Sequence, residues 1–195
     1  MTDLSELTQE DLDCLRQAQT MAITELKQFG SVLPKAIVDG EGHGAVLVAE
    51  GFSDDEAKYA FARMVKTAGI ALHADRTLFS AESWAVDVKG KSKEEIKQLM
   101  DEWSGRISEC PQRQEVMIVS LETHKASWMI SYPMERPNGG DAILGVPKVI
   151  RMDPGQNEGT MGNLLPPRDV QEAARRSGED KKAEALLLSV GIQVR

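Results

Sequence analysis

The chain has 195 residues, of which 41% are hydrophobic, 28% are charged and only 5% are aromatic, so it can form one domain with an aliphatic core. Its net charge of −8 comes from the first sixty residues, where twelve carboxylates outnumber four basic side chains. This region argues against nonspecific nucleic-acid binding, because phosphate contacts need a basic surface, and it permits an acidic face for a basic partner. A solvated helix surface is the simpler interpretation of the same charges.

The two cysteines, Cys14 and Cys110, do not form a C-x-x-C pair, so we expect reduced structural thiols. The sequence has no recognisable signal peptide, no apolar run of membrane-spanning length and no glycosylation motif. These features favour the cytoplasm and predict no association with a membrane.

A long helix is predicted first, capped by Thr8 with Asp11 and ended by Gly30. Two strands, Lys35–Asp39 and Ala45–Glu50, then flank a glycine-rich turn. A phosphate-binding loop would lead directly into a helix, whereas here another strand follows, so the pattern favours a hairpin.

A second helix is predicted to begin with Ser53 and Glu56 as a capping box and to end at Gly69. Residues 70–88 read as an extended segment. Ser92 and Glu95 form another capping box before a third helix. The side chains of this third helix that we expect to point inward are Ile96, Leu99, Met100, Trp103 and Ile107.

The central stretch, residues 115–132, predicts a β-hairpin. Val116–Leu121 is almost continuously apolar, as in a strand that is covered on both faces. The following segment alternates, with Trp128, Ile130 and Tyr132 on one face. We therefore expect a hairpin at the centre of a sheet, with its second strand less protected than its first.

After Pro133 the composition changes, and residues 133–168 contain six of the eight prolines. Only Ala142–Met152 could form a strand there, and Pro147 would place it at a sheet edge. Two short helices are expected to follow, Arg168–Arg176 and Asp180–Val190. The sequence thus predicts a core domain over residues 1–132 and, over residues 133–195, a Pro/Gly-rich arm with short C-terminal helices that packs on the core or extends from it.

Two patterns, D-R-x-x-F-x-x-E-x-W ending at Trp84 and P-x-R-x-E-V around Arg113, resemble those of uncharacterised prokaryotic and phage proteins. The resemblance implies that Glu82, Trp84 and Arg113 belong together. We hypothesise that Glu82 and Arg113 pair across neighbouring strands beside the indole of Trp84. An ion pair that fixes strand register is the simpler interpretation, and a ligand-binding site is the alternative.

The sequence contains little that indicates catalysis. None of the three histidines, His43, His73 and His124, has a partner at metal-ligand spacing, and no P-loop, dinucleotide fingerprint or nucleophile elbow occurs. We therefore predict no metal, no cofactor and no catalytic residue, and we expect a protein that is not an enzyme.

The expected fold is α+β, a mostly antiparallel sheet of about five strands with helices packed on one face and an irregular C-terminal arm. The leading hypothesis for function is a non-enzymatic interaction or accessory protein, in one version phage-encoded and host-interacting. One alternative is an enzyme or small-ligand-binding protein with a pocket between the sheet and the 133–168 arm, using Glu82, Arg113 and a histidine. The other is a structural protein that self-associates into a homo-oligomer through its first helix or a strand edge.

Overall fold

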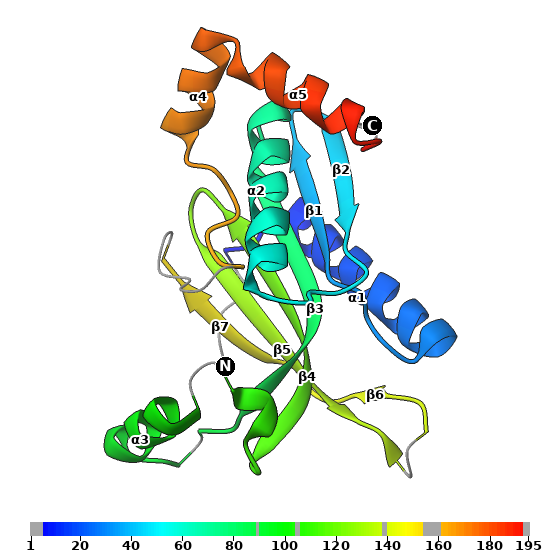
Figure 1. Cartoon of the computed structure of the whole chain (residues 1–195), viewed down its shortest axis with the longest axis vertical. Coiled ribbons are helices and arrows are strands. Elements are labelled where there is room, and N and C mark those ends of the chain that lie inside the picture. The colour runs from blue at the N-terminus through cyan, green and yellow to red at the C-terminus, as the bar shows by residue number, and fades with distance from the viewer. Residues whose placement is uncertain (1–5, 89, 104–105, 138–139, 154–160, 193–195) are drawn as a thin grey trace.

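The computed structural model describes residues 6–88, 90–103, 106–137, 140–153 and 161–192. These residues form a seven-stranded, mostly antiparallel sheet in the order β2-β1-β3-β4-β5-β6, with β7 also paired to β5 (Figure 1). The strands are β1 (Lys35–Gly40), β2 (His43–Val48), β3 (Arg76–Val86), β4 (Arg113–Thr123), β5 (Ser127–Glu135), β6 (Ile143–Leu144) and β7 (Lys148–Met152). The helices are α1 (Gln9–Phe29), α2 (Asp55–Ala71), α3 (Lys93–Trp103), α4 (Arg168–Ser177) and α5 (Glu179–Ser189), with a short 3₁₀ turn η1 (Ile107–Glu109) before β4. The predicted α+β class is confirmed, with more strands than the five expected.

The predicted central hairpin is confirmed as β4 and β5. Strand β4 lies between β3 and β5 and pairs with both along most of its length. Within Val116–Leu121 every residue except Ile118 is buried. In β5 the buried apolar side chains alternate with half-exposed ones, so this strand is the less protected of the two, as its sequence pattern predicts.

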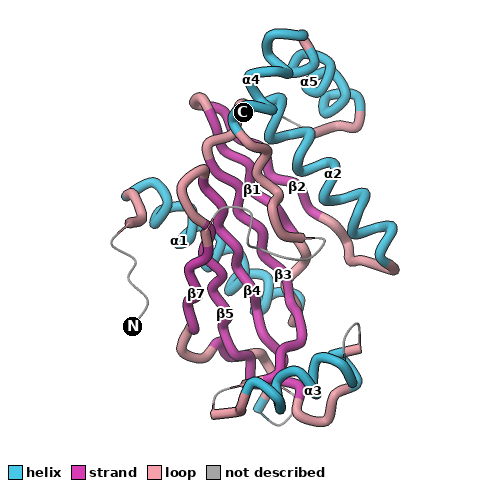
Figure 2. Tube along the Cα trace, turned by 90° about the vertical axis from the view of Figure 1, so that its left-hand side faces the viewer, coloured by secondary structure: helices cyan, strands magenta, loops and turns pink. Residues whose placement is uncertain are grey.

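The expectation that the helices pack on a single face of the sheet is wrong. Helix α1 covers one face and α2 covers the opposite face (Figures 1 and 2). The reason lies in β1 and β3, where Ile37 and Leu78 face α1 while Val38 and Phe79 face α2. A sheet with apolar side chains on both faces has to be covered on both.

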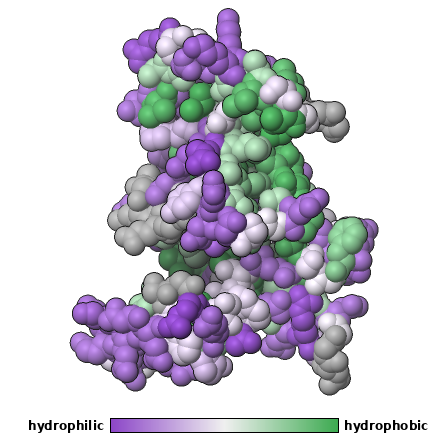
Figure 3. Space-filling view, viewed as in Figure 1, coloured by the Kyte–Doolittle hydropathy of each residue, from purple (hydrophilic) through white to green (hydrophobic). Residues whose placement is uncertain are grey.

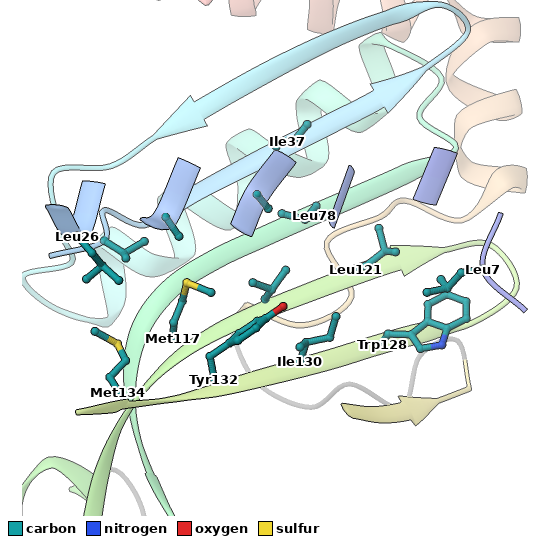
Figure 4. Packing of buried hydrophobic residues seen from close by; sticks show 14 of the residues in the cluster. Leu7, Leu26, Ile37, Leu78, Met117, Leu121, Trp128, Ile130, Tyr132 and Met134 are labelled. Carbon is teal, nitrogen blue, oxygen red and sulfur yellow. The ribbon is translucent and has the colours of Figure 1, made fainter. Parts of the chain in front are cut away.

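The core on the α1 side joins the helix to β3, β4 and β5 (Figure 4). Ala18, Ala22 and Leu26 recur every fourth residue of α1 and are buried against the sheet. Their partners across the interface include Ile37, Leu78, Met117, Val119, Leu121, Trp128, Ile130 and Tyr132. Small side chains on the helix let it approach the sheet closely.

The core on the α2 side also receives the C-terminal helices. Phe61 of α2 stacks edge-on against Phe79 of the sheet, with ring centroids 6.3 Å apart. Leu164 and Leu187 are fully buried in the same cluster, which brings the segment before α4, and α5 itself, onto α2. The C-terminal helices at the top of Figure 1 therefore belong to the packed body of the molecule.

Most helix boundaries follow from local sequence signals. The capping boxes of Thr8 with Asp11 and of Ser92 with Glu95 are confirmed, and Gly30 ends α1 in the left-handed region (φ 73°). The expected cap Ser53 is wrong, because Asp54 caps α2 by accepting from the Ala57 amide.

The expected end of α2 at Gly69 is also wrong, since the helix continues to Ala71. Gly69 lies inside the helix because the ring of Pro166 packs there, so close that a Cβ at this position would come within 2.6 Å of the proline Cδ. This glycine makes room for a neighbouring segment and does not terminate the helix.

The C-terminal region combines regular and irregular parts. The predicted strand Ala142–Met152 is interrupted at Pro147 and forms β6 and β7, both paired to β5. The two predicted C-terminal helices are confirmed within one residue at each end as α4 and α5. Residues 138–139 and 154–160 of the predicted arm lie outside the described part of the chain, and the domain boundary after residue 132 stays a prediction, with β5 continuing to Glu135.

Candidate functional site

The three predicted site residues lie on one face of β3 and β4, the face that α1 covers further along the sheet. The register pairs Glu82 with Met117 and Val86 with Arg113. Val86 lies two positions after Trp84 in β3, so both side chains are on the same face. The Arg113 guanidinium lies 5.1 Å from the centroid of the Trp84 ring, so the expected stacking is formed. No ion pair joins Glu82 to Arg113, so the expected pairing of these two side chains is wrong.

Glu82 is held instead by Arg136, which directly follows β5. Arg136 binds Glu115 through two hydrogen bonds of 3.0 Å, donates to the Gly30 carbonyl at 2.7 Å, and lies 3.6 Å from Glu82. The Val32 amide donates to the Glu82 carboxylate at 2.7 Å. This cluster fastens the end of α1 and the loop after it to the sheet, which is a structural role.

The electrostatics of the cluster follow from this geometry. Burial raises the pKa of Glu82, the Val32 hydrogen bond opposes this, and the neighbouring charge of Glu115 raises it further despite Arg136. The hydrogen bond to Glu115 raises the pKa of Arg136, so the guanidinium stays charged. Arg136 was not predicted as a site residue because β5 continues past Pro133 to Glu135, where the composition predicted irregular structure.

Many carboxylates of the acidic N-terminal third are paired inside the molecule. Arg76 contacts Glu10, Asp11 and Asp39 at 2.7 to 3.2 Å, which fixes the start of α1. Lys35 is fully buried and forms an ion pair with Glu25 of α1. These acidic groups therefore hold α1 on the sheet.

Strand β2 lies at an edge of the sheet, and no described segment pairs with its outer side. Val46 and Val48 are 46% and 55% exposed and lie on the α1 face, but α1 does not extend over them. Between α1 and this strand is a groove of about 560 Å³, lined among others by Cys14, Gln17, Ile37 and Val46. Figure 3 shows apolar residues gathered over β2 and the C-terminal half of α5.

The chain segment around this groove is acidic. Residues 36–57 contain six carboxylates and neither lysine nor arginine. Arg76 and Arg175 pair with Asp39 and Glu41, and Lys58 pairs with Asp55. Asp54 also interacts with the charge of Lys58, so Glu50 and Glu56 are the two without a basic partner among the described residues.

Two hollows of about 450 and 470 Å³ lie on either side of the β4–β5 turn and share Thr123, His124 and Arg168. The second lies between the strand ends and the segment before α4, where the Glu122 carboxylate accepts from the Leu165 amide at 2.9 Å. His124 Nε2 is 3.1 Å from the Ala74 carbonyl, and burial lowers the pKa of this imidazole. Both groups are therefore engaged in contacts within the protein.

Helix α3 lies at the far end of β3 and β4. Its expected inward side chains line a small apolar hollow of about 110 Å³ together with Trp84 and Val86 of the sheet. None of the described α3 residues is buried, and Met100 is 54% exposed. The apolar face of α3 is therefore only lightly packed.

Within the described ranges, no three His, Cys, Asp or Glu side chains come together in a way that could hold a metal ion. No described helix is both long and apolar enough to cross a membrane. Comparisons with known proteins found no matching family model, no matching curated protein and no matching solved structure.

Proposed function

We propose that this protein acts without catalysis, by binding another protein along the β2 side of the sheet. The observation that carries the proposal is the uncovered apolar surface of Val46 and Val48, which lies beside an open groove and is bordered by carboxylates. Apolar surface rimmed by polar groups is typical of protein interaction sites. Aliphatic side chains at the centre would bury apolar surface of the partner, and the charges at the rim would orient it.

The chemistry of the remaining polar clusters supports a binding role over an enzymatic one. Arg76 and Arg136 are each surrounded by carboxylates that hold α1 in place. Glu122 accepts a backbone hydrogen bond, and His124 lies within hydrogen-bond distance of another backbone group. Polar groups that form ion pairs and hydrogen bonds within the protein in this way stabilise the fold.

The setting of the protein is part of the same proposal. Cys14 and Cys110 are both free thiols, which is consistent with a reducing compartment such as the cytoplasm. A phage-encoded accessory protein that binds a host protein is one concrete form, and it depends on the resemblance of the patterns around Glu82 and Arg113 alone.

The test compares cross-linked complexes captured from source cells by the wild type and by V46E/V48E. The matched control is V88E/V170E, which changes two valines of similar exposure elsewhere. Circular dichroism should show that all three proteins fold. We expect V46E/V48E to lose a partner that the wild type and the control both retain, and equal capture by all three proteins would contradict the proposal.

A small-ligand-binding protein is the second candidate, and one observation favours it. Trp128 lines the first hollow by His124, and its buried indole nitrogen has no hydrogen-bond partner among the described residues. A ligand with a hydrogen-bond acceptor would satisfy it. Thermal-shift screening of a metabolite panel tests this, with H124A as the variant. A stabilising compound that has no effect on H124A would support the ligand-binding function, and no stabilising compound would leave protein binding as the only candidate.

A further inference from the structure

We infer that β2 binds its partner by strand addition, and that the partner segment is an extended, apolar stretch with basic residues at its ends. This inference rests on the proposed function, since it names the mode of binding and the chemistry of the partner at the same surface. It is carried by three features of β2: the direction of its backbone groups, the groove beside it and the charges around it.

The backbone of β2 offers a row of hydrogen-bonding groups. Its register pairs Gly40 with His43 and Val38 with Ala45, and the Ala49 amide donates to the Pro34 carbonyl at 2.9 Å. Because antiparallel strands alternate between inward and outward groups, the odd-numbered residues of β2 bond to β1. The amides and carbonyls of Gly44, Val46 and Val48 therefore point away from the sheet.

The sequence of β2 lacks the devices that usually protect an edge strand. His43–Val48 contains no proline, lysine, arginine or carboxylate. By contrast, β7 near the opposite end of the sheet follows Pro147 and carries Lys148 and Arg151. Edge strands are commonly kept from pairing by charged side chains and proline, so β2 is the edge left open to a further strand.

The groove explains why the partner should be apolar at alternate positions. In an added strand, the residue opposite Val46 would place its side chain on the same face as Val46. That face borders the groove of about 560 Å³ that Cys14, Gln17 and Ile37 line. Main-chain hydrogen bonds would supply affinity, and an aliphatic side chain in the groove would supply specificity, as in other cases of strand addition.

Charge decides between a foreign partner and a second copy of this chain. Asp39, Glu41 and Asp55 already pair with Arg76, Arg175 and Lys58, whereas Glu50, which follows β2, has no basic partner among the described residues. A second copy of residues 36–57 would bring neither lysine nor arginine to Glu50. Like charges oppose association, whereas basic residues at both ends of a foreign segment would bring a cation to Glu50 in either strand direction. The occupant is therefore a basic segment of another protein.

The experiment uses the full chain and a synthetic peptide in which valine and threonine alternate between basic residues at both ends. Binding is measured by fluorescence anisotropy, with the same peptide carrying glutamate at its ends as a control. V46P removes the outward amide of Val46 without touching the β1 ladder, since proline is tolerated where the N–H faces solvent. V46T is the matched control, because it keeps both the amide and a β-branched side chain.

We expect V46P to weaken binding of the basic peptide at least about tenfold, V46T to change it by less than about threefold, and the acidic peptide not to bind. In the wild type, amide hydrogen exchange of Gly44, Val46 and Val48 should slow when the basic peptide binds. This second measurement decides the question if V46P fails to fold.

Equal binding of the peptide to V46P and the wild type, no binding at all, or protection at other amides would overturn strand addition. Concentration-dependent dimerisation of the free protein that V46P abolishes would replace the foreign segment with a second copy. If V46E/V48E loses its cellular partner while V46P retains it, the proposed function stands and the strand-addition mode is wrong.

Discussion

Arg136 makes the contacts that connect α1 to the sheet at the helix C-terminus. Replacing it with alanine leaves Glu82 and Glu115 facing each other without a cation and the Gly30 carbonyl without its donor. We expect R136A to lower the free energy of unfolding by about 2 kcal/mol, because partly buried charged hydrogen bonds are lost. Urea denaturation measures the change.

The matched control for R136A is R16A, because Arg16 is well exposed and, among the described residues, forms an ion pair with Asp13 alone, one turn earlier in α1. Exposed pairs of this kind contribute little, so R16A should change stability by less than about 0.5 kcal/mol. Equal effects of R136A and R16A would show that the cluster around Arg136 does not hold the helix.

The raised pKa of Glu82 predicts a dependence of stability on pH. A carboxyl group that binds its proton more tightly in the folded state contributes stability below its ordinary pKa of 4.5, and this contribution is lost as the pH rises through the raised value. E82Q removes the titration while its side-chain oxygen can still accept from Val32. We expect the free energy of unfolding of E82Q minus that of the wild type to be larger at pH 7 than at pH 4. Urea denaturation at both pH values measures this difference.

A fully buried lysine such as Lys35 is unusual in a sheet. The effect of replacing it on stability should depend strongly on Glu25. K35M leaves the Glu25 carboxylate without its cation and should cost about 3 kcal/mol, the low end for a broken buried pair, because Glu25 is partly exposed. Replacing both residues in E25L/K35M should return stability to within about 1 kcal/mol of the wild type. A double variant as unstable as K35M would contradict this explanation.

At the scale of single elements, α2 has its glycine where the segment before α4 crosses it. Gly to Ala inside a helix ordinarily stabilises a protein by up to about 1 kcal/mol. At Gly69 the added methyl group would meet the rigid ring of Pro166, so we expect G69A to destabilise by about 1 to 3 kcal/mol. T67A replaces a half-buried side chain that bonds to the Arg63 carbonyl of the same helix, and it should change stability little. If urea denaturation showed that G69A is stabilised, the segment around Pro166 would have moved without a loss of stability.

The elements that the sequence predicted well are those with local signals. The capping box at Thr8, the glycine at position 30 and the alternation after Ser127 each specify structure within a few residues. The placement of helices on both faces could not be predicted in this way, because it depends on which strands are neighbours. The edge position of β2 could not be predicted for the same reason, since strand order is a property of the whole sheet.

The candidate site shows the same limit. The stacking of Arg113 on Trp84 could be predicted from a motif, since both residues lie on adjacent strands of opposite direction. The partner of Glu82 could not, because Arg136 follows a segment whose prolines indicated irregular structure. No local sequence signal shows that such an arginine will reach the carboxylates of neighbouring strands.

On the scale of the whole molecule, local stability should differ sharply between the two ends. Helix α2 buries Phe61, Val65 and Ala68, whereas α3 buries no described residue. We expect amides within α3 to exchange with solvent at least about a hundredfold faster than those at the centre of α2, since opening α3 exposes little apolar surface. Hydrogen–deuterium exchange with mass spectrometry measures both, and equal protection would mean that α3 opens only with global unfolding.

The length of β3 and β4 has a practical consequence. Each strand contains eleven residues and is therefore about 35 Å long, which puts α3 at the other end of the molecule from α4 and α5 (Figure 1). A fluorophore or a biotin linker attached to α3 would stand well clear of β2. Immobilising the protein through this helix would present every copy to solution in one orientation, with the same strand facing outward.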